Sequence, residues 1–150
     1  MIQFTYNDDV YHGYTKDQAL AAGVPLSVWD VKEFEAEQAN KLKEINDAAQ
    51  RALDTLLVTY PKGEITSFDK QESEARAYLD DAAAPTPLLN ALAEHREMDK
   101  DELVRRVIEK ADAFAAASGA IIGKRQKLED ALNVLTSDAN TLNDIAAITW

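Results

Sequence analysis

The segment Gly119-Ala-Ile-Ile-Gly-Lys-Arg is the part of this sequence that comes nearest to a phosphate-binding loop, in which glycines and a lysine hold phosphate oxygens. It is one residue too short, no Ser or Thr follows Lys124, and a predicted helix precedes it instead of a strand. Each glycine within a helix costs about 1 kcal/mol relative to alanine. Because Ala115, Gly119 and Gly123 recur every four residues, we expect either close contact with a neighbouring helix or a kink.

Residues for acid–base or metal chemistry form no recognisable pattern. His12 and His95 are the two histidines, and no carboxylate spacing around either one builds a metal triad. Neighbouring acids such as Glu72 and Glu74 arise by chance in a chain with 29% charged residues. The sequence has no cysteine, which excludes disulfides, thiolate nucleophiles and cysteine-based zinc sites. We therefore predict a non-enzymatic protein without a metal or cofactor.

The aromatic residues are concentrated in the first quarter of the chain. Rigid aromatic anchors are typical of protein-binding surfaces, but the same residues could equally form the thickest part of the core. Trp150, at the end of the sequence, is either docked or frayed. We predict partner contacts through the aromatic set and through outer apolar positions of the last long helix. The predicted residues are Phe4, Tyr6, Tyr11, Tyr14, Trp29, Ile108, Ile122 and Trp150.

The first 26 residues differ from the rest and are expected to form a separate segment from the helical residues 27–150. Alternating apolar residues on both sides of Asn7-Asp8-Asp9 predict a β-hairpin or an extended arm over residues 1–14. Thr15 and Gln18 form a capping box for a short helix that stops at Gly23.

Two long helices are predicted, from Ser27 or Asp30 to about Tyr60 and from Asp99 or Lys100 to at least Leu135. Apolar residues recur at alternating steps of three and four in both, which is typical of a coiled coil or helical hairpin. Arg125 lies on the second of these lines. A buried unpaired charge costs several kcal/mol, so its guanidinium must either reach water or pair with an acid such as Glu129.

Two shorter helices are expected between the long ones, over residues 65–82 and 86–97, the first entered by a brief extended piece. Thr86 can cap free backbone N–H groups, and Pro87 suits the first helical position, where its missing N–H costs nothing. Asp99 and Glu102 form a start signal for the last long helix. The expected fold is mainly α: a long antiparallel helical hairpin with short bracing helices and a small N-terminal β-arm.

Length and charge limit the partners. A chain of 150 residues fits one domain of usual size, and its net charge of −11 is spread along the sequence without any basic face. We therefore expect no nucleic-acid partner, since such proteins need clustered Lys and Arg. No apolar run approaches 18 residues, so no membrane-spanning helix is expected.

Several blocks of the sequence resemble the helical domain of tail-fibre assembly proteins from bacteriophages and R-type pyocin clusters, in the same order and with approximately the same spacing. They are the segments 59–75 (TYPKGEITSFDKQESEA), 84–89 (APTPLL), 110–114 (KADAF) and 119–132 (GAIIGKRQKLEDAL). The resemblance covers about the last two-thirds of the chain. It implies a chaperone-like role in folding a tail fibre, and the family has no catalytic motif to carry over.

Together, the residues and the resemblance predict an assembly factor that binds a phage tail-fibre protein in the cytoplasm of the host bacterium. The alternative is a structural component, such as a fibre-bound cap or a baseplate adaptor, that is retained in the virion tail. Long apolar lines along both helices also suggest a dimer or trimer, because part of the core can be completed by another copy.

Overall fold

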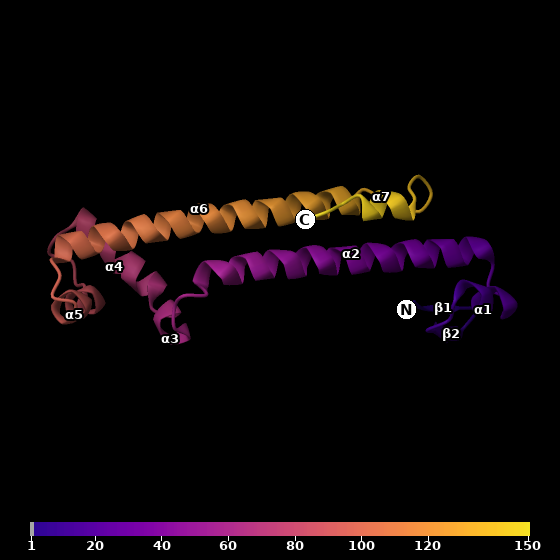
Figure 1. Ribbon diagram of the computed structural model, residues 1–150, viewed down its shortest axis with the longest axis horizontal. Helices are drawn as coiled ribbons and strands as arrows, with labels where there is room; N and C mark the ends of the chain where they lie inside the picture. Colours follow the sequence, from indigo (N-terminus) through magenta and orange to yellow (C-terminus); the bar gives the residue numbers. More distant parts are fainter. Residues whose placement is uncertain (1) are drawn as a thin grey trace. The chain divides into compact units, whose positions relative to one another are not determined.

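The computed structural model describes residues 2–150 and is mainly α-helical, as expected (Figure 1). Two strands open the chain, β1 (Gln3–Tyr6) and β2 (Asp9–His12). The helices are α1 (Lys16–Ala21), α2 (Leu26–Leu57), α3 (Lys62–Ile65), α4 (Phe68–Asp80), α5 (Pro87–His95), α6 (Lys100–Asn133) and α7 (Leu142–Ala146). The chain forms two compact units. The first contains the chain up to Gln50 together with Gly123–Trp150, and the second contains Arg51–Ile122.

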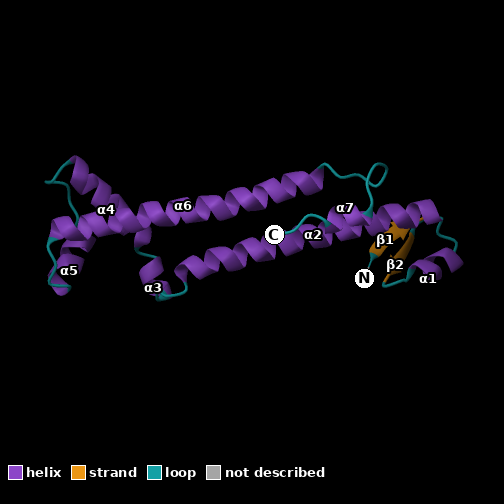
Figure 2. Ribbon diagram, turned by 45° about the horizontal axis from the view of Figure 1, so that its top comes forward, coloured by secondary structure: helices purple, strands orange, loops and turns teal. Residues whose placement is uncertain are grey.

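The predicted N-terminal hairpin is confirmed (Figure 2). β1 and β2 pair antiparallel, with Phe4 opposite Tyr11, and their rings stack with centroids 5.1 Å apart. Asn7 and Asp8 form the turn with φ values of 50° and 68°, a left-handed conformation that matches the twist of a two-residue hairpin. Phe4, Tyr11 and Trp29 then form a buried core with residues of α1 and its following loop. Residues 2–26 form part of the first unit.

Helix α1 begins and ends as the sequence predicts. The Gln18 N–H donates to the Thr15 hydroxyl, and the Thr15 N–H donates to the Gln18 side-chain oxygen, completing the capping box. Gly23 has φ = +91°, and the Val24 N–H donates to the Ala19 carbonyl, which is the Schellman pattern of a helix end. The short helix is therefore fixed at both ends before α2 begins.

Within the first unit, α2 and α6 run antiparallel, which confirms the predicted helical hairpin. The Gln38 side-chain amide donates to the carbonyls of Leu132 (2.8 Å) and Leu135 (3.3 Å). Eight residues further along α2, Asn46 accepts a bond from Arg125, which lies earlier in α6. The two Gln38 bonds thus tie α2 to the last turn of α6 and to the residue two positions beyond its end.

Apolar residues on both helices pack between these polar contacts. Phe34 and Ile45 of α2 contact Leu132 of α6 and Ile145 of α7, and all four are buried. Arg125 is paired, because its guanidinium donates to Glu129 at 2.8 Å as well as to Asn46. The sequence left two alternatives for the Arg125 guanidinium, contact with water or a pair with an acid, and the structure shows the pair.

The core of the second unit lies where α4, α5 and the start of α6 meet. Ala75, Leu89, Leu103 and Val104 are at most 1% exposed. Beside them lies the buried carboxylate of Glu74, which is 3% exposed. One oxygen accepts the Leu89 N–H at 3.0 Å, and the other lies 3.2 Å from the Lys70 ammonium. Glu74 thus caps the first turn of α5 from a different helix.

This arrangement corrects the prediction that Thr86 caps α5. Its hydroxyl donates to the Asn90 side chain at 3.2 Å and makes no cap bond. Glu74 instead accepts one of the free N–H groups at the start of α5, that of Leu89. Pro87 does stand at the start of the helix, as predicted. The Asp99 carboxylate accepts the Glu102 N–H at 3.1 Å, which confirms the start signal of α6.

Three other details differ from expectation. Residues 62–65 form the short helix α3 in place of an extended piece, because the hydroxyls of Thr66 and Ser67 bond back to carbonyls of the preceding turn. Helix α6 ends at Asn133, two residues before the predicted minimum. It continues unbroken through Gly119 and Gly123, and a Cβ at either glycine would meet nothing within 4 Å. The expected close contact is therefore not made within the described residues.

Glu74 generates a prediction about stability. We expect Glu74→Ala to lower the free energy of unfolding by about 1–3 kcal/mol, because the Leu89 N–H stays buried without its acceptor. Glu74→Gln keeps an acceptor oxygen and should cost less. Urea unfolding followed by circular dichroism measures both. Glu72→Ala, which removes an exposed pair with Arg76 on the same helix, is the control and should change stability by less than about 1 kcal/mol. Equal effects at positions 72 and 74 would contradict the cap.

The end of α5 generates a second prediction. Glu97 has φ = +51°, and the Met98 N–H donates to the Ala93 carbonyl, so a non-glycine residue occupies the left-handed position of a Schellman motif. We expect Glu97→Gly to raise stability by up to about 1 kcal/mol, because glycine adopts this conformation without a steric cost. Glu94→Gly, three residues earlier within α5, should lower stability by about 1 kcal/mol. Thermal unfolding of both variants measures the difference, and a lower melting temperature for Glu97→Gly would refute it.

Candidate functional site

Residues with metal or acid–base chemistry are not brought together in the part of the chain that the structure describes. No group of three or more His, Asp or Glu side chains over residues 2–150 could hold a metal ion. His12 ends β2 and His95 ends α5, and both are exposed. Residues 119–125 lie inside α6. They therefore do not form the loop between a strand and a helix that a phosphate-binding loop requires. None of the helices over residues 2–150 has the length and apolar character needed to cross a bilayer.

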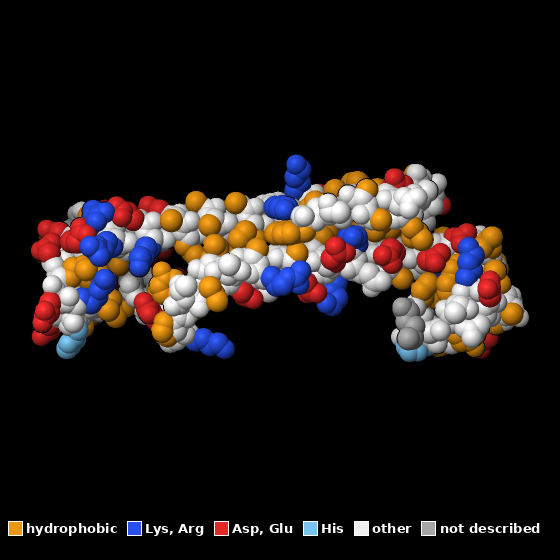
Figure 3. All heavy atoms as spheres, viewed as in Figure 1, with side chains coloured by type: hydrophobic (Ala, Val, Ile, Leu, Met, Phe, Trp, Pro, Cys, Tyr) orange, Lys and Arg blue, Asp and Glu red, His pale blue; other side chains and the backbone are white. Residues whose placement is uncertain are grey.

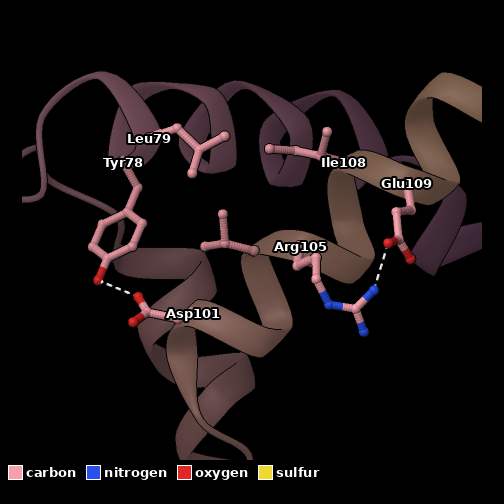
Figure 4. Close-up of a pocket in the computed structure, with 7 residues that line it drawn as sticks. Tyr78, Leu79, Asp101, Arg105, Ile108 and Glu109 are labelled. Atoms are coloured by element: carbon pink, nitrogen blue, oxygen red, sulfur yellow. Dashed lines mark hydrogen bonds and ion pairs between the residues drawn. The ribbon is translucent and has the colours of Figure 1, made fainter.

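The second unit instead carries an apolar groove between α4 and the first half of α6 (Figure 4). It is open to solvent on one side and has a volume of about 270 Å³. The residues that line it are Tyr78, Leu79, Asp101, Val104, Arg105, Ile108 and Glu109. Figure 4 shows Leu79 and Ile108 facing the same space from the two helices.

The spacing of apolar residues on each helix explains the groove. Val104 and Ile108 are four residues apart and therefore share one face of α6. Val104 is buried against the core of the unit, whereas Ile108 is half-buried. On α4, Ala75 packs into that core and Leu79, one turn later, is 66% exposed. The two helices thus leave a strip of apolar surface uncovered beside their own core.

One end of the groove is closed by a tyrosine and a carboxylate. The Tyr78 hydroxyl donates to Asp101 at 2.7 Å, and this bond raises the pKa of the Tyr78 phenol above its ordinary value. The Lys100 ammonium lies 4.3 Å from the centroid of the Tyr78 ring, within cation–π range. These contacts hold the Tyr78 ring in place on the rim.

The opposite rim is an ion-pair network on α6. Arg105 donates to Glu102 at 2.8 and 2.9 Å and also to Glu109, while Arg106 donates to Glu102 at 2.6 Å. The Arg105 and Arg106 guanidinium groups together lower the pKa of the Glu102 carboxyl from 4.5 to about 2. The rim charges are therefore balanced by one another, and the chemistry that the groove offers is binding of an apolar group.

The residues that the sequence predicts as contacts with a partner protein lie in several different environments in the structure. Phe4, Tyr11 and Trp29 are 3–8% exposed in the core of the first unit, so their rings face inward. Tyr6 is half-buried against that core, and Tyr14 is 40% exposed.

The remaining three predicted contact residues lie outside the core that Phe4, Tyr11 and Trp29 form. Trp150 is half-buried against the core of α2, α6 and α7, with the Lys124 ammonium 4.5 Å from its ring centroid. Ile108 lines the groove, and Ile122 is 42% exposed further along α6. Contact between any of these residues and a partner remains a prediction.

The contribution of α4 to the groove was not predicted. Ala75, Tyr78 and Leu79 stand at positions i, i+3 and i+4, which marks one apolar side of a helix. That pattern predicts an apolar stripe, but it does not indicate that Ala75 is covered while Leu79 is left exposed.

Comparison with models of protein families gives a match. The model of a family described as HI1402 helical domain matches residues 109–150, which contain most of α6 and all of α7. This description names a helical domain and no activity. Neither a curated protein nor a solved structure matches the chain.

The rim network generates a prediction on pH. The folded pKa of Glu102, about 2, lies below the ordinary 4.5, so folding favours its ionised form. The stability that it contributes is complete above about pH 4.5 and is lost as the pH falls towards 2. We expect the side-chain carboxyl carbon of Glu102 to titrate near pH 2 by NMR, and Glu102→Gln to weaken the pH dependence of unfolding in this window. Glu64→Gln, in α3 and outside the network, is the control. A Glu102 midpoint near 4.5 would contradict the network.

Proposed function

We propose that this protein is a non-enzymatic assembly factor for a phage-type tail fibre, which it binds through apolar helix surfaces. The fibre as partner rests on the sequence resemblance over residues 59–132. The observation that carries a binding role is the groove between α4 and α6, where Leu79 is 66% exposed beside Ile108. Exposed apolar surface with a polar rim is typical of protein-binding sites.

The chemistry of the groove suits such a partner. Intertwined fibres pair their strands non-locally, fold slowly and expose apolar segments and open strand edges while they do so. A groove that is apolar inside, with rim charges already paired, can hold an apolar side chain of an unfolded segment without leaving a buried charge unpaired. The net charge of −11 would help to keep the complex in solution.

The same surface would also serve a structural component that stays in the virion tail, and the two roles differ in what happens after assembly. An assembly factor acts in the cytoplasm of the host and leaves the fibre. A cap or baseplate adaptor is retained at fixed stoichiometry. Mass spectrometry of purified particles distinguishes them, since stoichiometric retention favours the structural role.

Co-expression with the fibre gene tests the proposal. We expect a soluble fibre trimer to form with this protein and not without it, as measured by size-exclusion chromatography with light scattering. Leu79→Glu places a charge in the groove and should reduce the yield of trimer, with binding weaker by about tenfold or more. Val134→Glu makes the same kind of change at a residue that is 75% exposed in the first unit, and it should behave as wild type.

Two results would overturn the proposal. A fibre that folds equally well alone, without forming a complex, would remove the assembly role altogether. A Leu79→Glu variant that is folded by circular dichroism and supports trimer formation as well as wild type would remove the groove from it.

A further inference from the structure

The N-terminal hairpin leaves backbone groups without partners along its outer edges. β1 and β2 pair antiparallel with Phe4 opposite Tyr11, and the register continues without a bulge. Just beyond the strands, the Gly13 N–H donates to the Ile2 carbonyl at 3.1 Å. Hydrogen-bonded and non-bonded pairs alternate along an antiparallel ladder, so Phe4 and Tyr11 form a bonded pair and the pairs next to them do not. The N–H and C=O groups of those neighbouring residues therefore point away from the partner strand.

The outward-pointing backbone groups belong to Gln3 and Thr5 on β1 and to Val10 and His12 on β2. All four residues are exposed, and among residues 2–150 no hydrogen bond outside the hairpin ladder uses their backbone groups. Proteins usually protect such edges with lysine, proline, bulges or a covering element. Apart from their length of four residues each, β1 and β2 have no such protection, since they contain no lysine or proline. On the face drawn in Figure 3, no Lys or Arg side chain lies over the hairpin.

Val10 distinguishes the edge of β2 from the edge of β1. Its side chain is 65% exposed, on the face of the hairpin opposite the buried Tyr11. A β-branched apolar side chain suits a strand that has neighbours on both sides. A third strand beside β2 would place a side chain about 5 Å from Val10, whereas a third strand beside β1 would lie next to Gln3 and Thr5. The edge of β2 therefore offers free backbone groups and an uncovered apolar side chain together.

We propose that an extended segment of the fibre protein pairs with the outer edge of β2 as a third strand. This inference rests on the proposed assembly role. The free groups of Val10 and His12 repeat every two residues, about 7 Å apart, and a backbone in the extended conformation presents matching donors and acceptors at this spacing. An intertwined fibre exposes such unpaired edges while it folds. Because main-chain bonds supply the affinity, the contact depends little on the sequence of the bound segment.

Amide hydrogen exchange, read for single residues by NMR, tests the pairing. In the protein alone we expect the amides of Val10 and His12 to exchange fast, since they have no acceptor, and those of Phe4 and Tyr11 to be protected by the ladder. In the complex with the co-expressed fibre, exchange at Val10 and His12 should slow by about tenfold or more. Protection of these two amides in the protein alone would assign the edge to a second copy of this chain and overturn the fibre as its occupant.

Two proline variants form a matched pair for the same test. Proline lacks the N–H, and a strand tolerates it where that N–H points outward, as it does at Thr5 and at Val10. These two residues are opposite each other, so either substitution should disturb the hairpin alike, and protection of the Tyr11 amide shows that the hairpin is still formed. We expect Val10→Pro to weaken binding of the fibre by about tenfold, measured by biolayer interferometry, and Thr5→Pro to bind as wild type.

The outcomes separate this inference from the assembly role. If the fibre trimer forms with this protein but exchange at Val10 and His12 is unchanged, the edge is not used and the assembly role stands. Equal binding by the two proline variants, whether full or reduced, would also overturn the edge of β2 as the contact. If no complex with the fibre forms at all, the assembly role is overturned and this inference falls with it.

Discussion

The arrangement of the second unit depends on one buried carboxylate. Glu74 is 3% exposed, and a carboxyl group removed from water needs polar partners. One oxygen accepts the Leu89 N–H at the start of α5, and the other lies 3.2 Å from the Lys70 ammonium. This requirement holds α4 against the first turn of α5 and brings Ala75 onto Leu103 of the shared core. The side chains one turn beyond Glu74 on α4 are then the ones that form the groove.

The small size of the buried clusters explains why apolar surface remains beside the core of the second unit. The buried side chains form three such clusters, and two of their members, Ala19 and Ala75, are alanines, which favour helix but bury little area. In the second unit, α4 covers α6 as far as the ion pair between Arg76 and Asp112, at 2.6 Å. Beyond Asp112 the same face of α6 continues through Ala115 and Ile122 without a helix of this unit over it. This face of α6 is therefore buried at its start, at Val104, and exposed further along, at Ile122.

Local chemistry made much of this fold predictable. The capping box at Thr15, the proline at the start of α5 and the spacing of apolar residues in α2 and α6 each act within a few residues, and the elements follow them. The cap of α5 could not be predicted in this way, because its acceptor, Glu74, lies fifteen residues before the donor and on another helix. Ile108 was recognised as an outer apolar position. Its neighbour across the groove, Leu79, was not, since the placement of α4 is decided by tertiary contacts.

Charged and apolar surface are separated along α6. Next to the groove, the acids and guanidinium groups of α6 are paired with each other or with α4, so a ligand there gains from burying Leu79 and Ile108 and not from new ion pairs. Further along α6, residues 113–123 carry no charge. A groove whose own charges are already paired accepts a segment with a suitable apolar side chain, which is the kind of binding that the proposed assembly role requires.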